Sequence, residues 1–348
     1  MSRIISYGEA IREATEQEMA RDPNVIVMGI GVDDFKAVFG TTGGLLERFG
    51  PERVFDTPLS EDAMTGVAIG AGLAGLRPIH VHIRMDFVLL AMNQLVNLAA
   101  KTRYMFGGQM SVPIVVRSVI GRSWGQGAQH SQGLHSLFTH IPGLKVFAPS
   151  TPYDVKGALI ESIRDNNPVM FVEHRMLHYI TGDVPEESYT VPFGKARILA
   201  EGDDVTIVGI SYMAVEAMRA RTHLSEAGIS AEVIDPVSLS PLDIDTIVES
   251  VRRTGRLLVV DSAWTNCGMT AEIVAQVAER LSGAREVRYA RMGYAPVPCP
   301  TTKNLEDLFY PNSQTIAQTA FTLCRENEPI FAVAHREAAE VSAFKGPF

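Results

Sequence analysis

Apolar and polar positions alternate in two long series along this chain. In the first series, short apolar runs typical of strands lie at residues 25–29, 78–83, 112–119, 144–148 and 169–172. Helical patterns accompany them at residues 61–74, 87–106, 132–140 and 151–164. Strands separated by helices of this length predict βαβ units and a parallel sheet. Because the strands are apolar throughout, we expect helices on both faces of that sheet.

The pattern breaks at residues 181–203, where glycine, proline and acidic residues favour a linker. A second series follows, with strands expected at residues 205–209, 231–234, 257–260 and 287–290, and helices expected at residues 214–227, 243–253 and 270–281. The sequence therefore predicts an α/β fold. Its two tandem domains, at residues 1–180 and 204–326, have largely parallel sheets, and residues 327–348 form a tail.

Composition and charge narrow the classes of function. The chain has 348 residues, 46% hydrophobic and 20% charged, so two ordinary domains can each bury a core. The net charge of −9 argues against a nucleic-acid partner. No stretch approaches the ~20 apolar residues of a membrane span. Cys267, Cys299 and Cys324 show no metal-ligand spacing, so we expect a reduced, cytoplasmic chain.

One glycine motif is misleading, and another is missing. The run Gly70-Ala-Gly72-Leu-Ala-Gly75 matches GxGxxG, but it lies late in a helical pattern and precedes a strand. A dinucleotide loop needs the reverse order, so these small residues are expected to serve helix packing. The chain also contains no Gly-Asp-Gly segment, with which thiamine enzymes usually hold Mg²⁺ and the cofactor's diphosphate.

Three stretches carry a family resemblance. The first is Val54-Phe-Asp-Thr-Pro-Leu-Ser-Glu61, leading into the glycine-rich residues 66–78. The second runs from Met85-Asp-Phe87 to Gly108. The third comprises Ala128-Gln-His-Ser-Gln132, Pro142-Gly-Leu-Lys-Val146, Ala148-Pro-Ser-Thr-Pro152 and Arg164-Asp-Asn-Asn-Pro168. Together, and in this order, they resemble the β subunits of the thiamine-diphosphate-dependent, decarboxylating component of pyruvate, branched-chain 2-oxo acid and acetoin dehydrogenase complexes.

The resemblance implies a fold, a cofactor and partners. The N-terminal domain would bind the aminopyrimidine ring of thiamine diphosphate, and the C-terminal domain would resemble that of transketolase and serve assembly. An α subunit would hold the diphosphate and Mg²⁺, which fits the missing Gly-Asp-Gly. Two α and two β chains would form a heterotetramer that passes its acyl product to a dihydrolipoyl acyltransferase core.

The resemblance assigns Glu61 to the family's catalytic glutamate. A carboxyl group bonded to the pyrimidine nitrogen favours the imino form of the cofactor, which can then take the proton from the thiazolium carbon. Without the motif, Glu61 would be an ordinary acid near Ser60 in a first helical turn. Phe87 matches the aromatic that stacks on the aminopyrimidine, a contact worth about 0.5–1.5 kcal/mol. The ordinary alternative is a core phenylalanine.

Three more residues take roles from the resemblance. His130 would orient substrate and assist acyl transfer to a lipoyl group. His135 and His140 follow at spacings of five, which do not share a helical face, so no metal cluster is expected. Asp165 and Asn167 fall where the family often holds a structural K⁺ through backbone carbonyls. A plain turn after a helix is the alternative there.

Several positions depart from the family pattern. Relatives usually carry Glu at Val81, an apolar or aromatic residue near Arg84, and a glycine- and alanine-rich loop where this chain has Arg122 and Trp124. Guanidinium groups bind carboxylates and phosphates bidentately. We therefore expect Arg84, Arg122, Trp124 and His130 to contact a substrate more polar than pyruvate. The alternative is that these arginines are solvated or paired with the α subunit.

Three functions remain at this stage. The leading one is oxidative decarboxylation of a 2-oxo acid, or acetoin cleavage, with acyl transfer to a lipoyl carrier. The second is a split transketolase-like enzyme that moves a ketol or acyl unit without a lipoyl partner. The third is a non-catalytic scaffold, against which the joint presence of Glu61, Phe87 and His130 argues.

Overall fold

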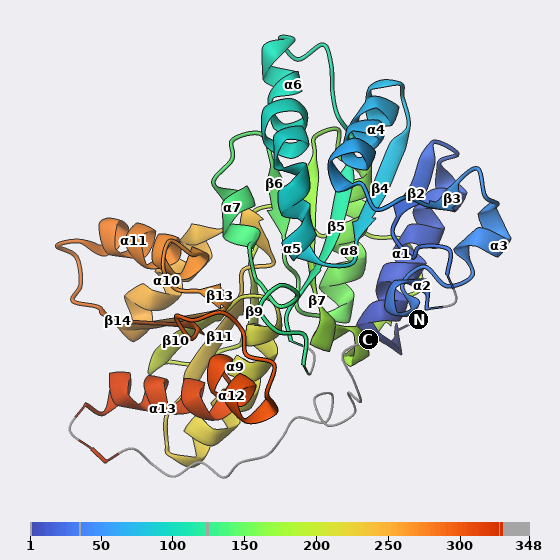
Figure 1. The fold of residues 1–348 in the computed structure, drawn as a ribbon. Helices are drawn as coiled ribbons and strands as arrows, with labels where there is room; N and C mark the ends of the chain where they lie inside the picture. Colours follow the sequence, from blue (N-terminus) through green and yellow to red (C-terminus); the bar gives the residue numbers. More distant parts are fainter. Residues whose placement is uncertain (1, 35, 123–124, 327, 330–348) are drawn as a thin grey trace. The chain divides into compact units, whose positions relative to one another are not determined.

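The computed structural model describes residues 2–34, 36–122, 125–326 and 328–329, which form two compact units (Figure 1). Unit 1 contains the described residues of Met1–Gly121, Leu137–Phe147 and Thr151–Phe193. Unit 2 contains those of Arg122–Ser136, Ala148–Ser150 and Gly194–Phe348. The short helix α7 (His135–Thr139) begins in unit 2 and ends in unit 1. The segment that carries His130 therefore belongs to unit 2, although it lies within the first half of the sequence.

Unit 1 is built on a parallel sheet with the strand order β6-β7-β5-β4-β2-β3. Its strands are β2 (Val25–Gly29), β3 (Val54–Asp56), β4 (Arg77–His82), β5 (Val115–Ile120), β6 (Lys145–Phe147) and β7 (Val169–His174). Every residue of β2, β5 and β7 is buried, as expected for strands covered on both faces. Because the strands are parallel, their carboxyl ends share one edge of the sheet.

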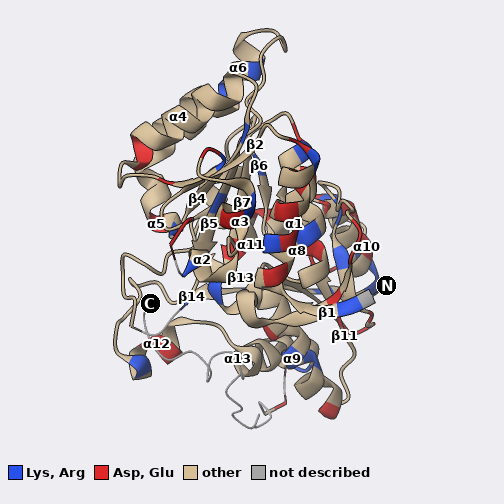
Figure 2. Ribbon diagram, turned by 90° about the vertical axis from the view of Figure 1, so that its right-hand side faces the viewer, with Lys and Arg blue, Asp and Glu red and all other residues tan. Residues whose placement is uncertain are grey.

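Helices cover both faces of this sheet. Helices α1 (Tyr7–Arg21) and α8 (Pro152–Arg164) pack against each other, and α4 (Glu61–Leu73) lies on the opposite side of the strands (Figure 2). Helix α1 begins with a capping box between Ser6 and Glu9, which explains its sharp start. The remaining helices of the unit are α2 (Ala37–Gly40), α3 (Leu45–Phe49), α5 (Met85–Val88), η1 (Leu89–Ala91), η2 (Gln94–Ala99), α6 (Ala100–Met105) and η3 (Arg175–Tyr179).

The single helix expected at residues 87–106 is divided into several pieces. Helix α5 passes into the 3₁₀ turn η1, the π-helical turn η2 and then α6. The side chain of Gln94, at the start of the π turn, donates to Asp62 of α4 at 3.1 Å. Single π turns are often found at functional sites, and this one holds the helix of Phe87 against the helix of Glu61.

The segment expected to be a linker carries ordered strands. Strand β8 (Thr181–Pro185) pairs antiparallel with β1 (Ser2–Ser6) and belongs to unit 1. Strand β9 (Arg197–Ala200) joins the sheet of unit 2. Buried Lys156 explains the order, since its ammonium group contacts Glu13 and the carbonyl oxygens of Pro185, Glu186 and Glu187 at 2.6–3.1 Å. The two units meet at Phe193 and Gly194, inside the expected segment, but the segment is not a structureless linker.

Unit 2 contains a sheet with the strand order β14-β13-β10-β11-β9, antiparallel only at β9. Helices α9 and α13 lie below this sheet in Figure 1, and α10 and α11 lie above it. The bounds of its elements are β10 (Val205–Gly209), α9 (Tyr212–Glu226), β11 (Ala231–Asp235), β12 (Ser238–Ser240), α10 (Ile244–Thr254), β13 (Arg256–Trp264), α11 (Met269–Leu281), β14 (Arg288–Tyr294), α12 (Lys303–Phe309) and α13 (Ser313–Cys324).

The predicted α/β fold is confirmed, since two units with mostly parallel sheets follow one another along most of the chain. Within the described ranges, no helix is long and apolar enough to cross a membrane. The expected tail at residues 327–348 lies almost entirely outside the described residues.

Candidate active site

The predicted cofactor residues of unit 1 lie at the carboxyl edge of its sheet. Glu61 follows β3 as the first residue of α4, and Phe87 follows β4 within α5. Strands β3 and β4 both pair with β2, so only one strand separates the loops that carry the two residues. Ligands of open parallel sheets bind outside the carboxyl ends of the strands, which makes this edge the candidate site.

Glu61 has the environment of a ligand-binding carboxylate. Its side chain is partly exposed, and among the described residues it has no hydrogen-bond or ion-pair partner. Ser60 makes no side-chain cap at this helix start, so Glu61 does not belong to a capping arrangement. A negative charge in the first turn of a helix is favoured by the helix dipole. The carboxylate therefore remains available to a nitrogen of a bound molecule.

Phe87 differs from an ordinary core phenylalanine. Its side chain is 37% exposed, whereas its neighbours Met85 and Val88 are fully buried. Buried neighbours fix the backbone, while more than a third of the Phe87 side chain stays accessible for stacking on a ring.

Two histidines of β4 are excluded as proton donors near neutral pH. Burial, and then the neighbouring His80, lowers the pKa of His82 to about 3. Burial lowers the pKa of His80 to about 4, and its Nε2 lies 3.2 Å from the hydroxyl of Thr65 on α4. Both rings are neutral at pH 7, so they contribute to packing and hydrogen bonding at this strand.

A buried ion pair fixes the neighbouring strands β5 and β7. The guanidinium of Arg117 donates to both carboxylate oxygens of Glu173, at 2.6 and 3.0 Å, and to the hydroxyl of Thr41 at 2.8 Å. His178 lies 3.1 Å from the same carboxylate. Burial alone would raise the pKa of Glu173, but Arg117 and His178 outweigh it and lower the pKa to about 2. Both oxygens of this carboxylate therefore bind side chains of the protein itself.

Arg84 follows β4 at the carboxyl edge of the sheet, but it is buried. Its side chain is only 8% exposed, and one of its nitrogens donates to the carbonyl oxygen of Ile83 at 2.9 Å. The guanidinium lies 5.6 Å from the ring of Phe39, and Arg175 lies 4.5 Å from the same ring.

The segment of unit 2 that carries His130 is anchored to α12. Arg122 forms an ion pair with Asp307 at 3.1 Å and lies 4.9 Å from the ring of Tyr310. The buried carboxylate of Glu306 accepts a hydrogen bond from the backbone N–H of Gly125, and burial raises its pKa. The Arg122 side chain is thus paired within its own unit, and its expected substrate contact stays a prediction. Trp124 lies outside the described residues.

His130 itself is partly exposed, and its backbone N–H lies 3.5 Å from the carbonyl oxygen of Gly127. The next turn of chain is fixed by a contact that local sequence did not predict. His135, fully buried, lies 3.0 Å from the buried carboxylate of Asp261 on β13. A side chain at Gly133 would meet the carbonyl oxygen of Ser262 at 1.8 Å, so only glycine fits there. Both contacts hold the chain directly after His130.

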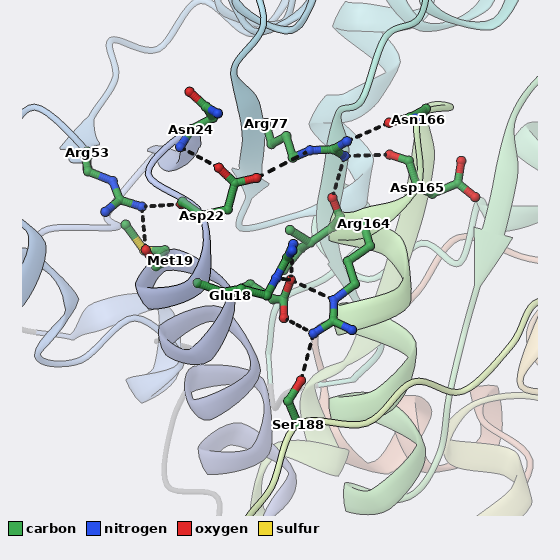
Figure 3. A network of polar contacts seen from close by, with 12 residues as sticks. Glu18, Met19, Asp22, Asn24, Arg53, Arg77, Arg164, Asp165, Asn166 and Ser188 are labelled. Atoms are coloured by element: carbon green, nitrogen blue, oxygen red, sulfur yellow. Dashed lines mark hydrogen bonds and ion pairs between the residues drawn. The ribbon is translucent and has the colours of Figure 1, made fainter.

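Asp165 and Asn167 come together in the turn after α8. The Asp165 carboxylate accepts hydrogen bonds from the backbone and side chain of Asn167, both at 2.7 Å, and forms an ion pair with Lys145. The Arg77 guanidinium donates to the carbonyl oxygens of Ile163 and Asp165 at 2.9 and 3.1 Å (Figure 3). Oxygen atoms therefore converge here, and positive side chains already contact them.

The expected packing role of the glycine motif holds for one of its three residues. A side chain at Gly72 would touch Pro113 at 3.4 Å, whereas Gly70 and Gly75 have nothing within 4 Å. Gly70 and Gly75 are exposed, and so are large apolar side chains of α4 and of the chain on either side of it. These residues are Leu59, Val67, Leu73, Leu90, Leu98, Tyr104, Met105 and Phe106. We call this set the apolar face; α4 carries charge only at its start, unlike α1 (Figure 2).

Comparisons with known proteins agree with this arrangement. The family described as "Transketolase, pyrimidine binding domain" matches residues 3–179, and "Transketolase, C-terminal domain" matches residues 194–316. A solved structure titled "Split gene transketolase, inactive beta4 tetramer" has a TM-score of 0.74 at 23% identity, covering 92% of this chain and 99% of that one. At this identity, the likeness supports the fold alone.

Curated relatives match over nearly the whole chain. The "Acetoin:2,6-dichlorophenolindophenol oxidoreductase subunit beta" of Cupriavidus necator is 46% identical over 330 residues, which cover 92% of this chain and 97% of that protein. The "Pyruvate dehydrogenase E1 component subunit beta" of Rickettsia bellii is 43% identical over 320 residues, covering 92% and 98%. The resemblance stated from the sequence is confirmed, and the chain belongs to the family of transketolase-type β subunits that includes those of acetoin oxidoreductase and pyruvate dehydrogenase.

Proposed function

We propose that this chain is the β half of a thiamine-diphosphate-dependent 2-oxo acid dehydrogenase and acts only with an α partner. The observation that carries the proposal is the pairing of Glu61, without a partner among the described residues, with half-exposed Phe87 at one edge of the sheet. A chain without Gly-Asp-Gly would leave the diphosphate and Mg²⁺ to the α subunit. When bound, thiamine diphosphate supplies the nucleophilic carbon of the reaction.

The residues of this chain would bind the cofactor ring and control protons. Glu61 would hold a proton at the pyrimidine nitrogen, and Phe87 would support the ring face. His130 would exchange a proton with the substrate or the acyl acceptor. Arg122 and Trp124 remain in the proposal only because they precede His130 closely in the sequence, since the Arg122 side chain is paired with Asp307.

The apolar face is the proposed contact with the α subunit in an α2β2 assembly. Tyr104 is 89% exposed and Leu90 is 60% exposed, which is unusual for side chains of this size. Tyr104 also borders a pocket of about 750 Å³, lined in part by Pro142, Asn167 and Pro168. Co-expression with Tyr104→Asp should prevent assembly, while Leu308→Asp, an exposed control outside the face, should not. Equal assembly of both variants would contradict this contact.

Cofactor binding and proton exchange test the central proposal. Calorimetry with thiamine diphosphate and Mg²⁺ should show binding by the α–β complex and none by the isolated β chain. In the complex, Glu61→Ala should slow exchange of the thiazolium C2 proton about 100- to 10,000-fold, the usual contribution of acid–base catalysis. Glu52→Ala, at an exposed position before β3, is the matched control. Tight binding by the β chain alone, or unchanged exchange in Glu61→Ala, would refute the proposal.

The acceptor and the location belong to the same proposal. We expect acyl transfer to a lipoyl group on a dihydrolipoyl acyltransferase core, and a cytoplasmic enzyme. Supplying the complex with either lipoamide or an aldehyde acceptor separates this from a split transketolase. Turnover with the aldehyde alone would favour the transketolase activity.

A structural K⁺ at Asp165 and Asn167 completes the proposal. The converging carbonyl oxygens suit a monovalent cation, and K⁺ would share them with Arg77. Thermal unfolding should occur at a higher temperature in potassium chloride than in choline chloride at equal ionic strength. Equal unfolding temperatures would show that Arg77 and Lys145 supply all the positive charge this turn needs.

A further inference from the structure

Two buried arginines of unit 1 lie against one aromatic ring. The guanidinium carbons of Arg84 and Arg175 lie 5.6 and 4.5 Å from the ring centre of Phe39. Both side chains are almost completely buried, at 8% and 2% exposure. We call these three residues the arginine–phenylalanine cluster. A ring face attracts cations, but it does not neutralise two of them.

Within the part of the chain that the structure describes, the buried negative groups nearby do not balance this charge. Glu173 binds Arg117 through both of its oxygens and also contacts His178, so its charge is already committed. Among the described residues, the Nε of Arg84 has no hydrogen-bond partner. The described acid that attracts Arg84 appreciably is Asp86.

The pKa values of both arginines are lowered, chiefly by burial. Burial lowers the pKa of Arg84 to about 10, and Asp86 only partly opposes this. Burial, and then repulsion by Arg84, lowers the pKa of Arg175 to about 9. Both guanidinium groups stay charged at pH 7, and a negative group between them would relieve their repulsion.

The backbone that carries the ring is held in an unfavourable conformation. Ala37, Val38 and Phe39 have φ values of 46°, 46° and 62°, in the left-handed region that side chains other than glycine disfavour. Such strain persists where the surrounding structure requires it, and it is concentrated at ligand sites. Here it places the Phe39 ring against both arginines and 5.6 Å from the ring of His178.

The position of the cluster connects it with the candidate active site. Phe39 follows β2, Arg84 follows β4 and Arg175 follows β7, so all three lie beyond the carboxyl ends of parallel strands. Glu61 follows β3 at the same edge, and Phe87 is three residues beyond Arg84. A molecule bound by Glu61 and Phe87 would have its reacting end on the same edge as the arginines.

We propose that Arg84 and Arg175 bind a second anionic group of the substrate, a carboxylate or phosphonate separate from its 2-oxo acid group. This inference rests on the proposed function and names its substrate class: 2-oxo acids with a negative group at the far end. Guanidinium groups bind such anions through paired hydrogen bonds. Arg122, the other arginine that departs from the family pattern, is used by Asp307 and is not part of this site.

Matched substrates measure the contribution of the far-end charge. The α–β complex is assayed with 2-oxovalerate against 2-oxoglutarate, and with 2-oxobutyrate against phosphonopyruvate. The wild type should prefer the anionic member of at least one pair by tenfold or more in kcat/KM. Arg84→Met should remove the preference, Arg84→Lys should keep part of it, and Arg252→Met, an exposed control on α10, should keep all of it.

Exchange of the thiazolium C2 proton, which needs no substrate, is measured on every variant. If exchange is absent from the wild-type complex, the proposed function fails. If exchange is normal but the wild type prefers the neutral substrates, or Arg84→Met keeps the anionic preference, only the present inference fails. If Arg84→Met instead prevents assembly with the α chain, while Arg84→Lys assembles with an unchanged preference, the anion is a partner carboxylate and the inference is overturned.

Discussion

Replacing Glu173 by glutamine should destabilise unit 1 strongly, because it leaves the buried guanidinium of Arg117 without a negative partner. Both side chains are at most 1% exposed, and their two hydrogen bonds measure 2.6 and 3.0 Å. Removing one partner of a buried ion pair costs about 3–5 kcal/mol. An amide of the same shape keeps the packing, so the loss measures charge and hydrogen bonding rather than a cavity.

The Glu173 carboxylate also makes the stability of unit 1 depend on pH. Its pKa falls from 4.5 when unfolded to about 2 when folded, where Arg117 and His178 outweigh the effect of burial. A lowered folded-state pKa contributes stability that is complete above the unfolded value and is lost as the pH falls from about 4.5 toward 2. The contribution at pH 7 is about 3 kcal/mol, since each pKa unit corresponds to about 1.4 kcal/mol. The glutamine variant should lack this acid-dependent loss.

Hydrogen exchange in β5 and β7 is the suitable assay, because these strands carry the pair and because local opening is measured there directly. Glu173→Gln should reduce amide protection about 100-fold or more at pH 7, while Glu226→Gln, exposed on α9, should not. The double variant Arg117→Met/Glu173→Met should lose less than either single variant, since no charge remains buried. Losses that simply add, or no loss in Glu173→Gln, would refute the reasoning.

Two further predictions concern the contacts around His130 and the apolar face. Gly133→Ala should lower the unfolding free energy by about 3 kcal/mol or more, because the new carbon meets the Ser262 carbonyl oxygen at 1.8 Å. In Gly70→Ala the new carbon meets nothing within 4 Å, so the unfolding free energy should rise by about 0.5–1 kcal/mol. Thermal unfolding compares the two variants, and equal shifts would contradict the contact. Asp261→Leu leaves the buried ring of His135 without its 3.0 Å partner and should cost about 1–3 kcal/mol by urea unfolding, whereas an unchanged midpoint would show the pair to be neutral.

The fold could be predicted from the sequence because its signal is local. Residues 25–29 and 205–209 coincide with β2 and β10, since short apolar runs bounded by polar residues leave little choice of structure. The order of β8 within the expected linker could not be predicted, because Lys156, on the distant helix α8, holds the end of that strand. No local pattern indicates that a lysine will hold three carbonyl oxygens.

The candidate site divides in the same way. Glu61 and Phe87 lie in recognisable motifs, and their positions at the sheet edge agree with the predicted roles, which remain to be tested. Arg175 lies 91 positions from Arg84 and carries no motif, so only the paired strands bring them to one ring. Arg122 shows the opposite case: its departure from the family motif predicts a substrate contact, whereas nothing in the local sequence indicates its ion pair with Asp307.

The arginines of unit 1 differ in what they do for stability, and this difference tests whether the cluster has a function. Arg117 is balanced by Glu173, so its loss should destabilise the protein. Arg84 is buried with too little negative charge around it, so Arg84→Met should leave stability unchanged or raise it by about 1–4 kcal/mol, even though it removes a contact with Phe39. A residue that lowers stability where an apolar side chain would fit is typical of a binding site. If urea unfolding shows Arg84→Met to be as damaging as Arg117→Met, Arg84 is a structural residue, and the surplus charge on which the anion site depends does not exist.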